Sequence, residues 1–305
     1  MSFDNLVGPL YEMNEFNGLI SSLQGSERVV ELYGISDTQK ALIAAAICRH
    51  FKKSCLFITY NDIVARKAYE DISFFSHDMA MVLPSTERTY HRIDARSNEI
   101  MQNRLKVYDH LVSGKCSVVC ASIEALLPRI ISPEFFRSMT MELSVGDTVD
   151  IEELKAFFIR AGFERIEMVE GKGQFSIRGG IIDFFSTIHD NPVRIELFDD
   201  EIDSIRYFDS ITQRSVSKVK SVRVIPSREF IVSEDEFKEA AERVSHEFET
   251  RLKSLSVSGK KKNTAATRLQ ELLGADIEKL KQGIYFEGIE KYKSYFTGKN
   301  YSSID

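Results

Sequence analysis

The stretch from Gly34 to Ala41 (Gly-Ile-Ser-Asp-Thr-Gln-Lys-Ala) stands where a phosphate-binding loop would stand, between a predicted strand and a predicted helix. A working P-loop reads G-x-x-x-x-G-K-[ST]: the second glycine lets the backbone wrap phosphate, the lysine neutralises it, and the hydroxyl binds magnesium. Gly34 and Lys40 fit, but Gln39 replaces the glycine and Ala41 the hydroxyl. Hydrolysis without a magnesium ligand loses its main charge stabiliser. We therefore predict a degenerate loop without catalytic residues and interpret Lys40 as solvated, with weak anion or nucleotide binding as the alternative.

A predicted strand at residues 173–185 carries a second candidate group. Ser176 and Arg178 lie on one of its faces, opposite apolar residues, and Gly179-Gly180 then interrupt the pattern. A glycine pair within a strand indicates a bulge or a place where another backbone comes close. We expect a bulge or a positive φ at one of the two glycines.

The next predicted strand, residues 192–198, alternates in the same way. One face carries Val193, Ile195 and Leu197, and the other carries Arg194, Glu196 and Phe198. Residues 199–201 form a turn, and residues 202–208 supply a third strand. Arg165 begins a strand before these, so we expect Arg165, Arg178 and Glu196, with Arg194 beside them, to form one exposed patch. Arginine pairs with carboxylates through two parallel hydrogen bonds. The residue pattern alone favours a solvated sheet face with internal ion pairs.

Other polar groups of the chain do not predict a metal site. The acidic run at residues 199–203 lacks the ligand spacing of a calcium loop, and the six histidines are scattered. The basic loop at residues 260–262 is interpreted as surface charge, with nucleic-acid contact as the alternative. The four cysteines (Cys48, Cys55, Cys116 and Cys120) lie in apolar surroundings, and we interpret them as reduced core residues of a cytosolic protein.

Length and composition limit the class of protein. A chain of 305 residues allows about two domains. Its net charge of −6 argues against a basic DNA-binding surface over the whole chain. No run of about 18 apolar residues and no signal-peptide pattern occur in it, so we expect a cytoplasmic protein without membrane contact.

The order of predicted elements indicates an α/β fold. Strands and helices alternate from residue 28 to 131, beginning with a strand at 28–33 and a helix at 42–51 capped by Asp37 or Thr38. This spacing predicts a parallel sheet covered on both faces. A helix and several strands follow from about 141, and helices return at 234–255 and 268–282. We therefore predict a degenerate P-loop-type parallel-sheet domain over 1–140, followed by a smaller α+β domain at 141–228 and then by helices.

The two segments FSIRGGIIDFF (175–185) and RIELFDDEIDSIRYFD (194–209) also carry a family resemblance. In this order and spacing they resemble domain 2 of bacterial transcription-repair coupling factors and, more distantly, the matching domain of excinuclease B. The resemblance extends over nearly the whole chain, and it implies that 1–140 and 229–305 are the two halves of one domain, with 141–228 inserted between them. It implies an N-terminal module of a coupling factor, a family in which this module has lost a working P-loop.

The resemblance also implies partners and a role. Arg165 and Arg178 match arginines by which such domains dock onto excinuclease A (UvrA), with Glu196 and Arg194 on the adjacent strand. Ser176 stands where the excinuclease B pattern has a further arginine. The family removes stalled RNA polymerase from double-stranded DNA and recruits nucleotide-excision repair enzymes. Its polymerase-binding and motor domains, with their ATP and magnesium, would lie outside this chain, so the implied function is protein docking without ATPase activity.

Two other functions remain as alternatives. The first is a fragment of a true excinuclease B, an ATP-dependent protein that binds damaged DNA; Gln39 and Ala41 argue against it. The second is a helicase-like half-domain that grips DNA directly. The acidic balance and the absence of interleaved aromatic and basic residues argue against that function.

Overall fold

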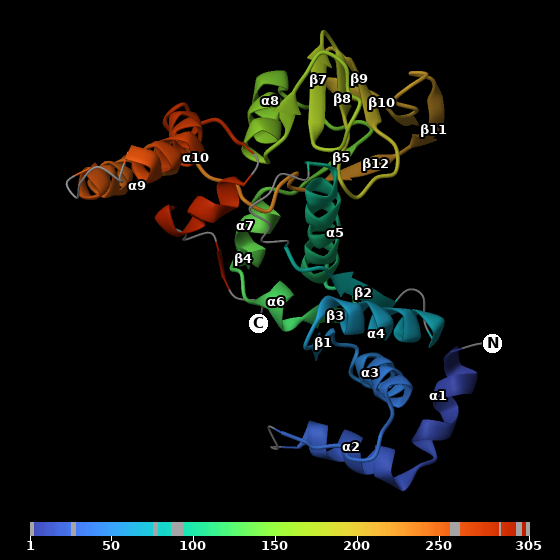
Figure 1. Ribbon diagram of the computed structural model, residues 1–305. Coiled ribbons are helices and arrows are strands. Elements are labelled where there is room, and N and C mark those ends of the chain that lie inside the picture. The colour runs from blue at the N-terminus through green and yellow to red at the C-terminus, as the bar shows by residue number, and fades with distance from the viewer. Residues whose placement is uncertain are drawn as a thin grey trace.

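The computed structural model describes residues 3–25, 29–75, 79–86, 94–256, 263–286, 288–296 and 301–302. Its first part contains a three-stranded parallel sheet (Figure 1). The strands are β1 (Cys55–Thr59), β2 (Ala80–Leu83) and β3 (Val118–Ser122), in the order β1-β3-β2. Every residue of the central strand β3 is buried. A central parallel strand buried on both faces reads as a continuous apolar run, as Val-Val-Cys-Ala does here.

Helices cover both sides of β3. Val118 and Cys120 pack with α3 (Asp37–Phe51) and α4 (Asp62–Phe75), whereas Val119 and Ala121 pack with α5 (Asp94–Val112). The remaining elements of this part are α1 (Phe3–Tyr11), α2 (Asn14–Gln24), α6 (Ile123–Leu126), β4 (Ile130–Ile131) and α7 (Pro133–Ser138). The predicted parallel α/β architecture is confirmed.

The structure corrects the prediction around the loop that precedes α3. Residues 29–33, predicted as part of a strand, are not in a strand, and Val29 and Tyr33 are 74% and 82% exposed. One face of β1 is uncovered too: Cys55 and Phe57 pack toward α3 and α4, whereas Leu56 and Ile58 on the opposite face are exposed. The N-cap of α3 is Ser36 rather than Asp37 or Thr38. A strand needs a neighbour to pair with, and local sequence does not supply one.

The second part is a six-stranded, mostly antiparallel sheet in the order β11-β10-β9-β8-β7-β6. Its strands are β6 (Glu164–Arg165), β7 (Gln174–Arg178), β8 (Ile181–Phe184), β9 (Val193–Phe198), β10 (Glu201–Phe208) and β11 (Ser215–Val219). One face packs on α8 (Ile151–Arg160), where Phe158 stacks on Phe175 with ring centroids 5.0 Å apart. The Asp150 side chain accepts hydrogen bonds from the backbone N–H groups of Glu152 and Glu153 and so fixes the start of α8.

The strands at which the chain enters and leaves this second part lie side by side. β5 (Met141–Ser144) pairs antiparallel with β12 (Ser221–Val224), so that Met141 lies opposite Val224. In Figure 1, α5 lies between this strand pair and the parallel sheet, and Arg223 of β12 forms an ion pair with Asp109 of α5 at 3.0 Å. The second part is thus an insertion whose two ends meet at one place.

Gly179 and Gly180 form the two-residue turn of a β-hairpin. The chain reverses between β7 and β8, and Arg178 pairs with Ile181, so the predicted single interrupted strand is two antiparallel strands. Gly179 has φ of +59°, which confirms the predicted positive φ. The expected close approach is also present, since a Cβ on Gly180 would lie 3.2 Å from the carbonyl oxygen of Leu197.

A valine at position 179 is expected to destabilise this hairpin. A β-branched residue at positive φ costs about 1–3 kcal/mol, while open space around Gly179 removes any steric contribution. Chemical denaturation of Gly179→Val should therefore show a lower free energy of unfolding than wild type. The matched control is Gly18→Val within α2, where space is also open and φ is helical. If both variants lost the same free energy of unfolding, backbone conformation at Gly179 would have no special role.

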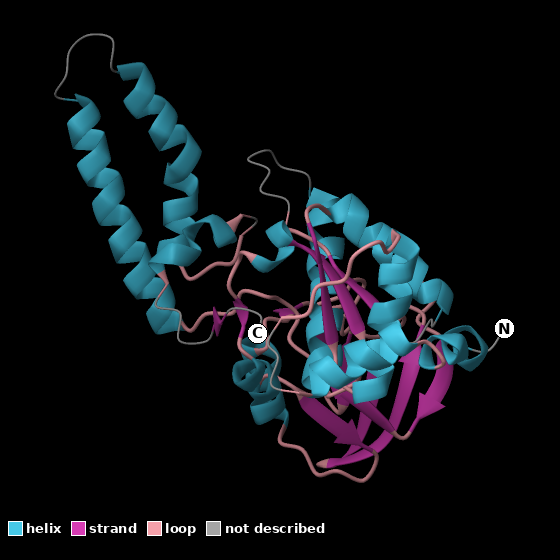
Figure 2. Ribbon diagram, turned by 90° about the horizontal axis from the view of Figure 1, so that it is seen from below, coloured by secondary structure: helices cyan, strands magenta, loops and turns pink. Residues whose placement is uncertain are grey.

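The third part consists of α9 (Glu234–Ser256), α10 (Asn263–Lys281), the short 3₁₀ helix η2 (Ile289–Tyr295) and β13 (Tyr301–Ser302). Figure 2 shows α9 and α10 as an antiparallel pair that projects away from the sheets. At its base lies a separate apolar core in which Phe230, Phe237 and Phe296 form edge-to-face contacts. β13 pairs with β4 and returns the chain to the first part.

Candidate functional site

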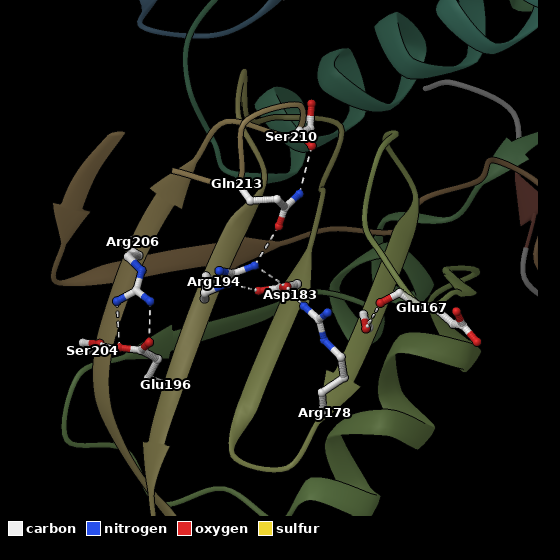
Figure 3. A network of polar contacts seen from close by, with 10 residues as sticks. Glu167, Arg178, Asp183, Arg194, Glu196, Ser204, Arg206, Ser210 and Gln213 are labelled. Atoms are coloured by element: carbon white, nitrogen blue, oxygen red, sulfur yellow. Dashed lines mark hydrogen bonds and ion pairs between the residues drawn. The ribbon is translucent and has the colours of Figure 1, made fainter. Parts of the chain in front are cut away.

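A row of polar residues crosses the sheet on the face opposite α8. Strand register places Ser176, Asp183, Arg194 and Arg206 opposite one another on β7, β8, β9 and β10. Residues two apart on a strand share a face, so Arg178 and Glu196 belong to the same surface. Figure 3 shows the labelled side chains of Arg178, Asp183, Arg194, Glu196 and Arg206 on one side of the sheet. We call this surface the polar face.

Asp183 is the centre of the polar face. Its side chain is 1% exposed, and it accepts hydrogen bonds from Arg194 Nε at 2.6 Å and Nη2 at 2.8 Å, and from Arg178 Nη2 at 2.8 Å. A carboxylate buried this deeply needs such charged donors. The Arg194 side chain, 15% exposed, also donates to Gln213 Oε1 and lies over the Phe208 ring at 4.5 Å. Hydrogen bonding to Asp183 raises the pKa of Arg194.

Arg178 differs from Arg194 in its exposure. Its side chain is 49% exposed, although Asp183 holds one of its terminal nitrogens. Asp183 and Arg194 therefore position the guanidinium of Arg178 at the surface. A preorganised arginine loses less conformational freedom when it pairs with a partner's carboxylate.

Glu196 pairs with Arg206 through two hydrogen bonds and also accepts one from Ser204 Oγ at 3.0 Å. Hydrogen bonding from Arg206 lowers the pKa of Glu196, so the carboxylate is ionised at neutral pH. About a third of its side chain is exposed. The sequence placed Glu196 on this face, but Arg206 was not identified as its partner.

An exposed aromatic side chain completes the polar face. Phe198, at the end of β9, lies two residues from Glu196 and is 79% exposed. The N–H of its neighbour Leu197 donates to Gly180 O at 2.8 Å, so the hairpin turn after Arg178 lies beside this end of β9. Aromatic and arginine side chains carry much of the binding energy at protein interfaces. The strand alternation had placed Phe198 on this face without indicating its exposure.

Arg165 is not brought together with this group. In the parallel pairing of β6 with β7 it lies opposite Phe175, whose side chain is buried in the core next to α8. Paired residues share a face, so Arg165 belongs to the α8 side of the sheet edge. The expected common patch of Arg165, Arg178 and Glu196 therefore lacks Arg165.

The P-loop-like stretch satisfies its own hydrogen-bond donors. Ser36 Oγ accepts from the Gln39 N–H at 3.3 Å, and Gln39 Oε1 accepts from the Ser36 N–H at 2.8 Å. Lys40 Nζ donates to Asp37 Oδ1 at 3.0 Å, and this contact lowers the pKa of Asp37. Two backbone donors that a phosphate would need are thus occupied by a capping box. Gly34 has φ of +73° and Ala41 is fully buried.

Comparison with known proteins gives two matching family models and several relatives. The family model of the UvrB interaction domain matches residues 141–230, and that of the UvrB third helical domain matches residues 235–298. The chain is 32% identical, over 99% of its length, to the transcription-repair-coupling factor of Bacillus subtilis.

This chain is a UvrB-like region.

Other relatives carry the name UvrABC system protein B. The UvrB-like region is 29% identical to the protein of Thermosipho africanus and 28% identical to that of Thermotoga maritima, over 94% and 92% of its length. It spans 25% of the Bacillus subtilis protein and 46% and 44% of these two. The predicted resemblance is confirmed, and the inserted sheet with its polar face falls within the matched interaction domain.

Within the described part of the UvrB-like region, no group of three or more His, Cys, Asp or Glu side chains is arranged to hold a metal ion. None of the described helices is long and apolar enough to span a lipid bilayer. The basic loop at residues 260–262 lies outside the described residues.

Proposed function

We propose that this UvrB-like region is a protein-docking module that binds UvrA through the polar face of its inserted sheet. One observation carries the proposal: a half-exposed Arg178 is held in place by the buried Asp183, on the same face as the exposed Phe198. The match of residues 141–230 to the UvrB interaction domain supports a protein partner. Arg194 acts mainly as a positioning residue, and Glu196 presents an ionised carboxylate beside Arg206.

We also propose that the region divides into 1–140, 141–228 and 229–305, with the middle unit inserted between two halves of the first domain. The pairing of β5 with β12 supports the insertion. Ile225 and Ile231, which follow the inserted sheet, pack in the same core as α5. The second half has its own core at the base of the α9–α10 pair, and β13 joins it to β4 of the first half.

The wider role proposed for this region comes from its relatives. As part of a transcription-repair coupling factor, it would recruit UvrA, and with it nucleotide-excision repair, to RNA polymerase stalled on DNA in the cytoplasm. We assign polymerase contact, DNA translocation and ATP hydrolysis to other parts of the full-length protein, since this chain spans 25% of the Bacillus subtilis relative.

The region by itself is expected neither to bind ATP tightly nor to hydrolyse it. The capping box between Ser36 and Gln39 occupies the donors that would hold phosphate, and Ala41 offers no hydroxyl for magnesium. Phosphate release with magnesium and ATP should equal that of the Lys40→Ala variant. Turnover that disappears in Lys40→Ala would contradict this expectation and favour an excinuclease B-type enzyme.

Capture of UvrA tests the docking proposal. The purified 305-residue chain, immobilised by a tag, should retain purified UvrA from the same organism, with ATP and magnesium kept constant. Binding of double-stranded DNA should be weak and should disappear between about 50 and 200 mM salt. Tight DNA binding without retention of UvrA would replace the docking module with a nucleic-acid-binding domain.

A further inference from the structure

All four cysteines lie in one region of the first domain, between the end of α3 and the strands β1 and β3. Cys48 on α3 and Cys116, just before β3, have their sulfur atoms 3.1 Å apart. Cys48 is 1% exposed, while Cys116 is half-buried. The Cys116 thiol lies 3.2 Å from the carbonyl oxygens of both Cys48 and Lys53, so its position is fixed from two sides.

Two thiols in direct contact need little movement to become a disulfide. The bond length is about 2.05 Å, so the two sulfur atoms would approach by about 1 Å. Cys48 lies in the last turn of α3, and Cys116 lies two residues before β3, so neither is part of the parallel sheet. We propose that Cys48 and Cys116 form a reversible disulfide in the presence of a two-electron oxidant such as hydrogen peroxide. This proposal does not depend on the binding of UvrA.

The exposure of the two residues gives the order of the reaction. The half-buried Cys116 reacts first: its thiolate attacks one peroxide oxygen, the O–O bond breaks, and a sulfenic acid and water form. The Cys48 thiol then attacks the Cys116 sulfur, its S–H proton passes to the departing sulfenic hydroxyl, the S–O bond breaks, and a second water leaves. In total two thiols and one hydrogen peroxide give one disulfide and two waters. Burial and the contact with Cys116 raise the pKa of Cys48, so this thiol is not the one that ionises and reacts first.

The other two cysteines provide internal comparisons. Cys55, the first residue of β1, is half-buried, and Cys120 in the middle of β3 is fully buried. Burial raises the pKa of Cys55, and raises that of Cys120 to about 12, so neither thiol is readily ionised. Among the described residues, direct sulfur–sulfur contact occurs between Cys48 and Cys116 alone.

The test is oxidation of the reduced chain with hydrogen peroxide, followed by alkylation and peptide mapping. Trypsin separates Cys48 (41–49), Cys55 (54–66) and the peptide that carries both Cys116 and Cys120 (116–129). Wild type should lose two of its four thiols, regain them with dithiothreitol, and melt several degrees higher when oxidised, because the cross-link restricts the unfolded chain. Fragmentation of the linked peptide distinguishes Cys116 from Cys120.

Cysteine variants make the outcome decisive. Cys55→Ser should form the same disulfide, whereas Cys116→Ser should keep its three remaining thiols at the same peroxide dose. Cys48→Ala gives the second test, and it should stop at the sulfenic acid on Cys116, detectable with dimedone. Four retained thiols in oxidised wild type, a Cys55–Cys116 link or a link between two chains would each overturn the proposal.

Discussion

Replacing Arg178 with alanine is expected to weaken UvrA binding from about 30-fold to several thousand-fold, the effect of removing an arginine that pairs with a buried carboxylate across an interface. The guanidinium is half-exposed in the free chain and is held there by Asp183. Folding should be nearly unaffected, because Asp183 keeps both hydrogen bonds from Arg194. Isothermal titration calorimetry and thermal melting measure the two quantities.

Arg165→Ala is the matched control for this variant. Both arginines are exposed and lie at the ends of neighbouring strands, but Arg165 belongs to the α8 side of the sheet edge. We expect near wild-type affinity for Arg165→Ala. The reverse result, with full affinity in Arg178→Ala and loss in Arg165→Ala, would move the interface to the other face.

Replacing Arg104 with methionine is expected to destabilise the chain by about 3–5 kcal/mol, since it leaves a buried ion pair broken. Arg104 is 1% exposed and donates from Nε to both oxygens of Glu229 at 2.8 and 3.0 Å. It also donates to Pro84 O at 2.6 Å and to Tyr108 Oη at 2.7 Å. This network joins α5 to the segment that follows the inserted sheet, so its loss removes a contact between residues far apart in sequence.

Arg243→Met on α9 is the control for the loss of Arg104. The Arg243 Nη2 atom lies 3.4 Å from Glu239 Oε2, and both side chains are about half-exposed. Arg243→Met should therefore change the free energy of unfolding by no more than about 0.5 kcal/mol. Urea denaturation of both variants gives the comparison. A double variant, Arg104→Met with Glu229→Gln, should recover part of the lost stability, because no carboxylate is then left without its cationic partner. If wild type and Arg104→Met unfolded at the same urea concentration, the proposed role of this network in stability would be refuted.

Local sequence predicted much of the polar face. The residues that the prediction missed or misplaced were missed or misplaced for physical reasons. Period-two alternation placed Arg194, Glu196 and Phe198 together, because side chains on one strand alternate regardless of the neighbouring strand. Asp183 was not recognised, since it stands within an apolar run and gains its partners only through the β7–β8 hairpin. Arg165 was placed wrongly because a two-residue strand has no alternation of its own, and its face is set by its register with β7.

The sequence did contain the pattern that identifies the N-cap of α3. Ser36, Asp37 and Thr38 are all N-cap residues, and the pattern Ser-x-x-Gln from Ser36 to Gln39 is that of a capping box. The reciprocal hydrogen bonds select Ser36 as the cap. By contrast, no local pattern could show that residues 29–33 lie outside the sheet, because strand formation there depends on a pairing partner.

Hydroxyl-radical footprinting of the chain with and without UvrA tests the docking face most directly. Phe198 and Phe74 are 79% and 78% exposed, so the two rings should be oxidised at similar rates in the free chain. Phe198 lies on the polar face, and Phe74 lies on α4 of the first domain. Docking through the polar face predicts that UvrA slows the oxidation of Phe198 while Phe74 is unchanged. An unchanged rate at Phe198 under conditions where the complex has formed would contradict it.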